Sequence, residues 1–312
     1  MAETGKAPAF RFGRHQTFPM RFTWPTKGYR YWCEGHDVYD HTDPSVVLGV
    51  GKNMVSAIKY WLQASGLVEE RSDFSLTPSE IGTLLLSPTL GHDPYLEDDA
   101  SLWLLHWNIA TNQNQATSFY WFFNHFHKLE FRPKEVVSAL EEFLKERTNT
   151  EVASTTLESD ISVLLRMYTP DSIEEKGNPL EDSLQSPMKL LGLIETSSDS
   201  TTYRITNTFR PDLPLAVFGY SLLDVMERLD SNNVAISRLL KSEDDIGAPG
   251  TVFKLNEEGL VSKLEELAAA YSDVFEIRET AGIHQVYRLK TKDKIALVAE
   301  HFREHSEQGS IQ

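Results

Sequence analysis

The clearest pattern in the N-terminal part of the chain is a helical repeat of apolar residues between Lys52 and Ser65. The apolar positions recur at the spacing of one helix face and comprise Met54, Val55, Ile58, Trp61 and Leu62. Gly66 follows in the position that commonly ends a helix. The segments LVEE and FSLT, on either side of a polar turn, then predict two small strands. Residues 10–32 mix aromatic and basic side chains with two prolines and show no sustained period, so we expect extended chain and turns there, before a short helix.

The order of helices followed by a hairpin recurs further along the chain. We expect helical segments at 157–167, 187–191, 216–229, 234–240 and 256–271. LGLIET and TYRIT predict one hairpin, and FEIRET and HQVYRL predict another. Helices followed by a hairpin wing are typical of winged helix-turn-helix modules. We therefore predict a mainly α fold of the α+β class, with two or three winged-helix-like modules whose wings are short β-hairpins.

Polar stretches predict how the chain divides. The stretch TNTEVASTT at 148–156 is the expected boundary between an N-terminal domain at 10–150 and a C-terminal domain at 151–312. A second stretch at 169–186 is rich in acidic residues, and we expect a mobile loop there. Residues 304–312 are expected to form a tail.

The composition limits the class of protein. With 312 residues, 40% of them hydrophobic, the chain is long enough to bury a sizeable core. The single cysteine, Cys33, excludes an internal disulfide framework and a cysteine-rich metal site. No 18 apolar residues follow one another, and no apolar run follows a basic start, so we expect a cytoplasmic protein without membrane contact.

Charge is distributed unevenly along the chain. The net charge of −16 at first argues against nucleic acid, because phosphate binding needs Lys and Arg. Residues 1–60, however, carry eight Lys and Arg against five Asp and Glu, whereas the other residues carry 22 against 41. The basic beginning indicates a place where DNA could bind, and an unevenly charged, solvated surface is the alternative.

The polar side of the 52–65 helix is the first candidate site. It carries Lys52, Asn53, Ser56, Lys59 and Gln63. The preceding GVGKN segment is not a nucleotide-binding P-loop, because Val46 and Asn53 stand where that motif needs Gly and Ser or Thr. The helix start and its lysines could instead hold DNA phosphates, while the Asn and Gln side chains suit base edges. A solvated helix face is the alternative.

The N-terminal arm is the second candidate site. Arg11, Arg14 and His15 lie close together, with Arg21 and Lys27 following as further DNA contacts. Arginine binds phosphate through two nitrogens, and histidine exchanges protons near neutral pH. We therefore expect Arg11, Arg14 and His15 to be catalytic, against the alternative that the arm only packs on the body.

An acidic segment is the third candidate. Asp93, Glu97 and Asp98 lie within HDPYLEDD, and converging carboxylates are the ligands with which Mg²⁺ or Mn²⁺ cleaves phosphodiesters. The alternative is that these residues fasten a turn and cap the helix starting near Ala100.

We expect His106, between two tryptophans, to be a satisfied core histidine. The six aromatic residues among residues 119–126 are interpreted as a core or dimer helix, which leaves a homodimer open.

Several blocks of sequence match a known family. They are Gly13–Tyr29 (GRHQTFPMRFTWPTKGY), Leu48–Leu67, DPYLED, SLWLLHW, DISVLLRMY and Gly250–Leu260. These blocks resemble the SspB-like family of bacterial DNA-nicking proteins, which are encoded with DNA phosphorothioation genes. The similar family members commonly have His-Glu-Thr-Phe where this chain has His15, Gln16, Thr17 and Phe18. The residue at position 16 therefore cannot be an acidic metal ligand here.

The resemblance implies a DNA nickase of a phosphorothioation and antiphage defence system. Its nicking domain would be the N-terminal domain, and it would work on double-stranded DNA beside a cysteine desulfurase, an ATPase and an ATP-dependent sulfur-transfer enzyme. The rival hypothesis is a non-catalytic DNA-binding adaptor that recruits the sulfur-transfer enzymes, which the winged-helix pattern would equally serve.

Overall fold

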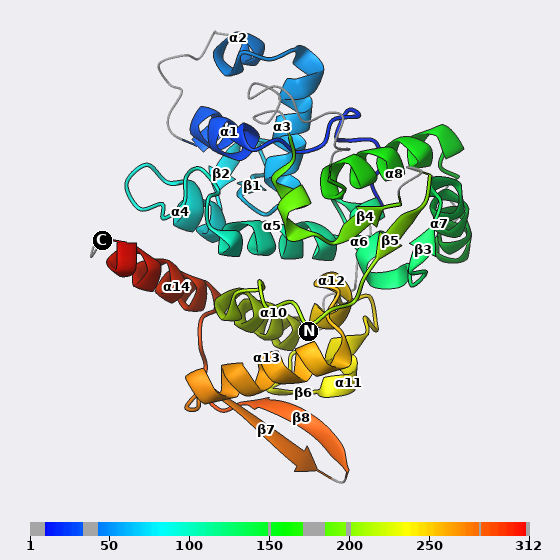
Figure 1. Cartoon of the computed structure of the whole chain (residues 1–312). Helices are drawn as coiled ribbons and strands as arrows, with labels where there is room; N and C mark the ends of the chain where they lie inside the picture. The colour runs from blue at the N-terminus through cyan, green and yellow to red at the C-terminus, as the bar shows by residue number, and fades with distance from the viewer. Residues whose placement is uncertain are drawn as a thin grey trace.

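Helices dominate the fold, and the strands form small antiparallel sheets (Figure 1), which confirms the α+β class. The structure is a computed structural model and describes residues 10–33, 43–148, 151–170, 185–197, 201–280 and 282–309. The elements up to residue 170 are α1 (Thr23–Cys33), α2 (Pro44–Leu48), α3 (Lys52–Ala64), β1 (Val68–Glu70), β2 (Leu76–Pro78), α4 (Glu80–Leu86), α5 (Asp99–Thr111), α6 (Thr117–His125), β3 (Glu130–Phe131), α7 (Pro133–Arg147) and α8 (Ser154–Tyr168). Those that follow are η3 (Pro187–Leu191), β4 (Ile194–Thr196), β5 (Tyr203–Ile205), α10 (Leu215–Arg228), β6 (Asn233–Ala235), α11 (Ile236–Leu240), α12 (Pro249–Val252), α13 (Glu257–Ala270), β7 (Phe275–Thr280), β8 (Ile283–Arg288) and α14 (Lys294–Gly309).

The first three helices and the β1–β2 hairpin form one packed unit at the end of the molecule drawn uppermost in Figure 1. The predicted apolar face of α3 is buried, with Ile58 and Trp61 at its centre. Helix α1 crosses it at Gly28, where a Cβ would lie only 2.6 Å from Ile58 Cγ2, so only glycine allows this close approach. Gly66 ends the unit's third helix with a φ of +71°, a conformation that glycine adopts without strain.

The prediction of extended chain for 10–32 is wrong from Thr23 onward, where α1 forms. Pro25 lies in the first turn of that helix, where a missing N–H costs no hydrogen bond. Trp24 and Tyr29 are each 2% exposed. Their burial stabilises a helix whose proline and glycine hide the apolar period in the sequence.

Helices α5 and α6 form the centre of the molecule. Every residue of α6 from Thr117 to Asn124 is buried, which confirms the interpretation of this aromatic segment as a core helix. His106 of α5 is also fully buried. Its Nε2 donates to the carbonyl oxygen of Val252 at 2.9 Å, so its Nδ1 accepts the hydroxyl of Tyr168 at 2.8 Å. This confirms a satisfied core histidine, and burial lowers the pKa of His106 to about 3.

The two later hairpins form where they were predicted, but each gains a third strand. Strand β3 pairs with β5 to give the order β3-β5-β4, and β6 pairs with β8 to give β6-β8-β7. The helix expected at 234–240 is therefore wrong at its start, because Val234 pairs with Val286 in the sheet. The tail expected from residue 304 is helical to Gly309 as part of α14.

Contacts cross the predicted domain boundary. Phe131 on one side of it pairs with Tyr203 on the other, and one continuous core contains buried residues from Met20 to Phe302. The acidic stretch expected to be a mobile loop lies almost entirely outside the described residues. Among the described residues, no helix is long and apolar enough to cross a membrane.

Candidate DNA-binding face and its surroundings

The outward face of α3 is accessible and carries no carboxylate. Lys52, Asn53 and Ser56 are exposed, while Lys59 and Gln63 are half-buried. Gly51 begins the helix without a side-chain cap, so the first backbone N–H groups are not taken by a capping side chain. The structure thus brings the five residues predicted from the sequence onto one helix surface.

The neighbouring β1–β2 hairpin places one carboxylate beside a lysine of this face. Glu70 of β1 lies with its Oε1 atom 3.4 Å from Lys59 Nζ. Both side chains are about one third exposed, so the attraction is weakened by solvent. Lys52 forms no ion pair of this kind among the described residues, although its charge contributes to lowering the pKa of the nearby Asp43 carboxyl, and it is exposed. It is therefore the stronger candidate for a phosphate contact.

The tip of the β1–β2 hairpin holds two residues that the sequence reasoning missed. Phe74 is 76% exposed and has a φ of +65°, a left-handed conformation that is uncommon for a bulky residue. Arg71 is exposed beside it, and its backbone closes the turn through hydrogen bonds with Ser75 and Phe74. An aromatic residue at a predicted wing tip was the available signal for this site.

The N-terminal arm is fastened to the body through His15, which is only 1% exposed. The backbone N–H of Thr17 donates to its Nδ1 at 3.1 Å, so its Nε2 carries the proton and donates to Asp160 Oδ1 at 2.9 Å. Gly13 N and Ser118 Oγ donate to the same carboxylate, at 2.9 and 2.7 Å. Both ring nitrogens are therefore occupied within the protein. The catalytic role of His15 stays a prediction, and in this geometry a DNA phosphate finds no free nitrogen on the ring.

The other basic residues of the arm differ in accessibility. Arg14 and Lys27 are exposed, and Arg11 is exposed but donates to the side chain of Gln115 at 2.7 Å. Arg21 lies over the rings of Phe18 and Trp24, and its partial burial lowers the pKa of its guanidinium. Arg14 and Lys27 are thus the cations of this group most open to an outside phosphate.

The acidic segment forms a tight turn that uses its own carboxylates. Asp93 is 6% exposed and accepts the backbone N–H of Glu97 at 2.9 Å and of Asp98 at 3.0 Å. Ser101 Oγ also donates to it, at 2.6 Å. Asp98 caps α5 by accepting Ala100 N at 2.8 Å.

These contacts do not fit a magnesium or manganese site. The lone pairs of Asp93 that a cation would need already accept three hydrogen bonds, and Glu97 is exposed, away from that buried carboxylate. Across the described ranges, no three His, Cys, Asp or Glu side chains are grouped so that they could hold a metal ion. The arrangement favours the alternative in which Asp93 fastens the turn and Asp98 caps the helix.

The fold and sequence together define the family. Residues 12–302 match the family described as "Protein of unknown function (DUF4007)", and the chain belongs to it. A crystal structure of SspB is similar to this structure, with a TM-score of 0.80 and 28% sequence identity, over 96% of this chain and 88% of that one. A magnesium ion-bound SspB crystal structure gives the same values. These similarities confirm the resemblance to SspB. No curated protein matches the chain.

Proposed function

We propose that this chain binds double-stranded DNA through the outward face of α3, in the service of an Ssp-type phosphorothioation system. One observation carries the proposal: an exposed, polar and cationic helix face without an acidic residue, on a chain whose net charge is −16. Lysines bind the phosphate backbone, whereas the Asn, Ser and Gln side chains of this face suit base edges in the major groove. The similarity to SspB supplies the link to phosphorothioation.

The order of the surrounding elements supports this proposal. Helices α1 to α3 are followed by the β1–β2 hairpin, which is the order of a winged helix-turn-helix module with α3 as its recognition helix. In such a module the hairpin tip approaches the neighbouring groove or backbone. Arg71 would then contact a phosphate, and exposed Phe74 would lie against the sugars or base edges of the minor groove.

We further propose that the chain nicks the bound DNA, which means that water is added across one phosphodiester bond of one strand. The resemblance to DNA-nicking proteins supports this activity. Arg14, exposed on an arm that His15 holds in place, is the residue we expect to bind the phosphate under attack, with Arg11 beside it. The magnesium-bound SspB structure supports a divalent cation as cofactor, but the turn at Asp93 does not fit as its site.

A plasmid-relaxation assay separates this proposal from the adaptor hypothesis. Purified protein is incubated with supercoiled plasmid and magnesium, manganese or EDTA. An open-circular product that EDTA abolishes supports a metal-dependent nickase. Binding without nicking, together with retention of the sulfur-transfer enzymes on DNA, supports the adaptor. Lys52→Glu serves as the control. If this variant still nicks DNA at the wild-type rate, the nicking comes from a contaminating nuclease or from DNA bound at a site other than α3.

A further inference from the structure

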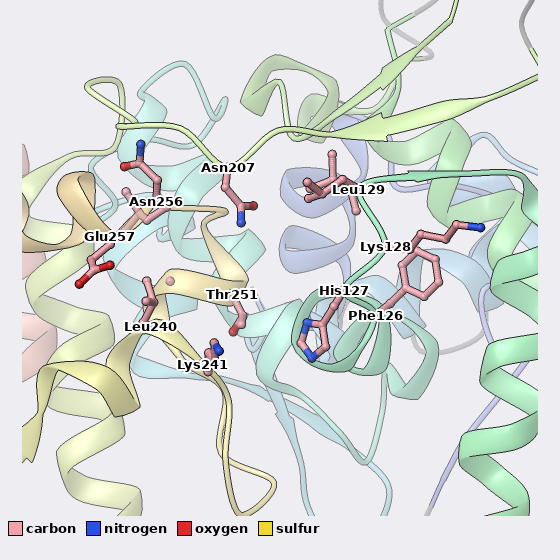
Figure 2. Close-up of a pocket in the computed structure, with 13 residues that line it drawn as sticks. Phe126, His127, Lys128, Leu129, Asn207, Leu240, Lys241, Thr251, Asn256 and Glu257 are labelled. Atoms are coloured by element: carbon pink, nitrogen blue, oxygen red, sulfur yellow. The ribbon is translucent and has the colours of Figure 1, made fainter.

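A pocket of about 570 Å³ lies between the end of α6, strand β5 and helices α11, α12 and α13 (Figure 2). The residues that matter chemically in its wall are His127, Asn207, Lys241, Thr251 and Asn256. Figure 2 shows the side chains of His127, Asn207, Thr251 and Lys241 around a common space. In Figure 1 these elements lie away from α2 and α3, so the pocket is separate from the proposed DNA-binding face.

Basic side chains outnumber acidic ones in the wall of the pocket, although the protein as a whole is acidic. His127 and Lys241 line it, and Lys128 lies at its rim, where it pairs with Glu135. The one carboxylate among the lining residues belongs to Glu257, and Figure 2 shows it pointing away from His127. Within the described part of the chain, the side chains of Lys241 and Asn207 have neither a hydrogen bond nor an ion pair.

Two buried basic side chains lie behind the wall of the pocket. Lys254 is 5% exposed, and its Nζ donates to the carbonyl oxygen of Phe123 at 3.0 Å. Arg210 is 7% exposed and donates to backbone carbonyls, one of them that of Phe253 at 3.2 Å. Among the described residues, neither has a carboxylate in hydrogen-bond contact, but the charges of Asp212 and Glu195 partly offset the lowering of the Arg210 pKa by burial. Burial lowers the pKa of Lys254 to about 7, with Arg210 adding to the effect.

Neighbouring lysines act electrostatically on His127 in the pocket wall. The pKa of His127 is lowered first by burial and then by repulsion from Lys254 and Lys241. Burial disfavours the charged forms of Lys254 and His127, and a bound anion would favour them. The N-terminus of α13 borders the same space, but the Asn256 side chain caps it by accepting Gly259 N at 2.8 Å, and Glu257 and Glu258 lie in its first turn, so it adds little positive potential.

The shape of the pocket narrows the choice of anion. Its volume is that of a small-molecule site, about 300 to 1,000 Å³, and is larger than a lone phosphate needs. Phe126 and Leu240 give it apolar walls against which a sugar or base can pack. We propose that this pocket binds the phosphate monoester of a nucleotide, carried by a free mononucleotide or by the 5′-phosphorylated end of a DNA strand. The mononucleotide is independent of the proposed nicking, whereas the DNA end rests on it.

The pH titration of the His127 ring by NMR tests this proposal. The signal is assigned with His127→Gln, and the probes are 5′-AMP, inorganic phosphate, and a dinucleotide with either a 5′-phosphate or a 5′-hydroxyl. A bound phosphate monoester raises the pKa of His127, because it stabilises the protonated ring. We expect Lys241→Glu to weaken binding of 5′-AMP by about tenfold or more. Lys134→Glu, which reverses an exposed lysine outside the pocket, is the matched control and leaves affinity within about twofold.

The probes distinguish the two sources. Binding of 5′-AMP and of the 5′-phosphorylated dinucleotide, but not of the 5′-hydroxyl form, supports a DNA end; binding of 5′-AMP alone supports a free nucleotide. The proposal is overturned if neither phosphorylated probe moves the His127 titration, if inorganic phosphate binds as tightly as 5′-AMP, or if Lys134→Glu weakens binding as much as Lys241→Glu. Binding of a hairpin duplex without a 5′-phosphate, measured on the same variants, tests the α3 face separately.

Discussion

At the residue scale, buried hydrogen bonds decide which predicted site residues are open to a ligand. The sequence predicts catalysis for His15 and metal binding for Asp93. Both residues are buried, however, and their polar atoms form hydrogen bonds inside the protein. Arg14 and Lys52 are exposed, so a ligand can reach them. Sequence context shows that chemically useful residues are close together, but it does not show whether neighbouring backbone N–H groups already occupy them.

Removing the His15 side chain should destabilise the fold. In His15→Ala, Asp160 loses one of its three donors in a buried place, and the turn around Gln16 and Thr17, both with positive φ, loses its anchor. We expect a loss of about 2 kcal/mol in the free energy of unfolding, measured by urea denaturation. Arg14→Ala, which removes an exposed neighbour, should leave it unchanged. Equal stabilities of His15→Ala and the wild type would contradict the anchoring role.

Asp93 and Glu97 should behave differently when each is neutralised. Asp93→Asn places an amide group against N–H donors and should cost about 2 kcal/mol of stability, seen as a lower melting temperature. Glu97→Gln changes an exposed side chain and should leave the melting temperature and nicking unchanged. Loss of nicking in both variants at unchanged melting temperature would instead support the metal site predicted from the sequence.

At the element scale, the strength of the local pattern determined what could be predicted. The α3 helix was predictable because its apolar stripe, polar stripe and terminal glycine agree with one another. Helix α1 was not, since its stability comes from burying Trp24 and Tyr29 against other elements. Strand β6 was missed for a similar reason: three residues form a strand only because β8 lies beside them.

The contact between α3 and β1 gives a prediction at this scale. Glu70→Gln removes the carboxylate next to Lys59 and leaves that lysine free for a phosphate. We expect it to bind duplex DNA about threefold or more tightly at low salt, because one nearby negative charge is lost. Glu279→Gln, an exposed change on distant β7, is the control. Unchanged or weaker binding by Glu70→Gln would place DNA away from this part of α3.

At the scale of the whole molecule, one core joins both halves, and the buried His106 makes the fold sensitive to acid. Burial lowers the pKa of His106 from 6.5 to about 3, so the unfolded chain binds a proton that the folded chain does not. The resulting stabilisation is complete above about pH 6.5 and is lost as the pH falls toward 3. In His106→Gln, the slope of unfolding free energy against pH between about 6 and 5 should decrease by about 1 kcal/mol per pH unit. An unchanged slope would show that His106 is protonated in the folded state.

The candidate sites were predictable to different degrees. The α3 face follows from helical spacing and from the absence of acidic residues, both of which are local. The pocket at His127 and Lys241 was not predictable, because its wall joins residues more than 100 positions apart and the buried charges of Lys254 and Arg210 are apparent only once the chain is folded.

The salt dependence of duplex DNA binding tests the central claim most directly. Affinity is measured for the wild type, Lys52→Ala and the control Lys134→Ala over a series of salt concentrations. If α3 binds DNA, the loss of the Lys52 phosphate contact lowers the steepness of log affinity against log salt by about one unit, and Lys134→Ala leaves it unchanged. Equal slopes and affinities for Lys52→Ala and the wild type would contradict the assignment of α3 as the DNA-binding face.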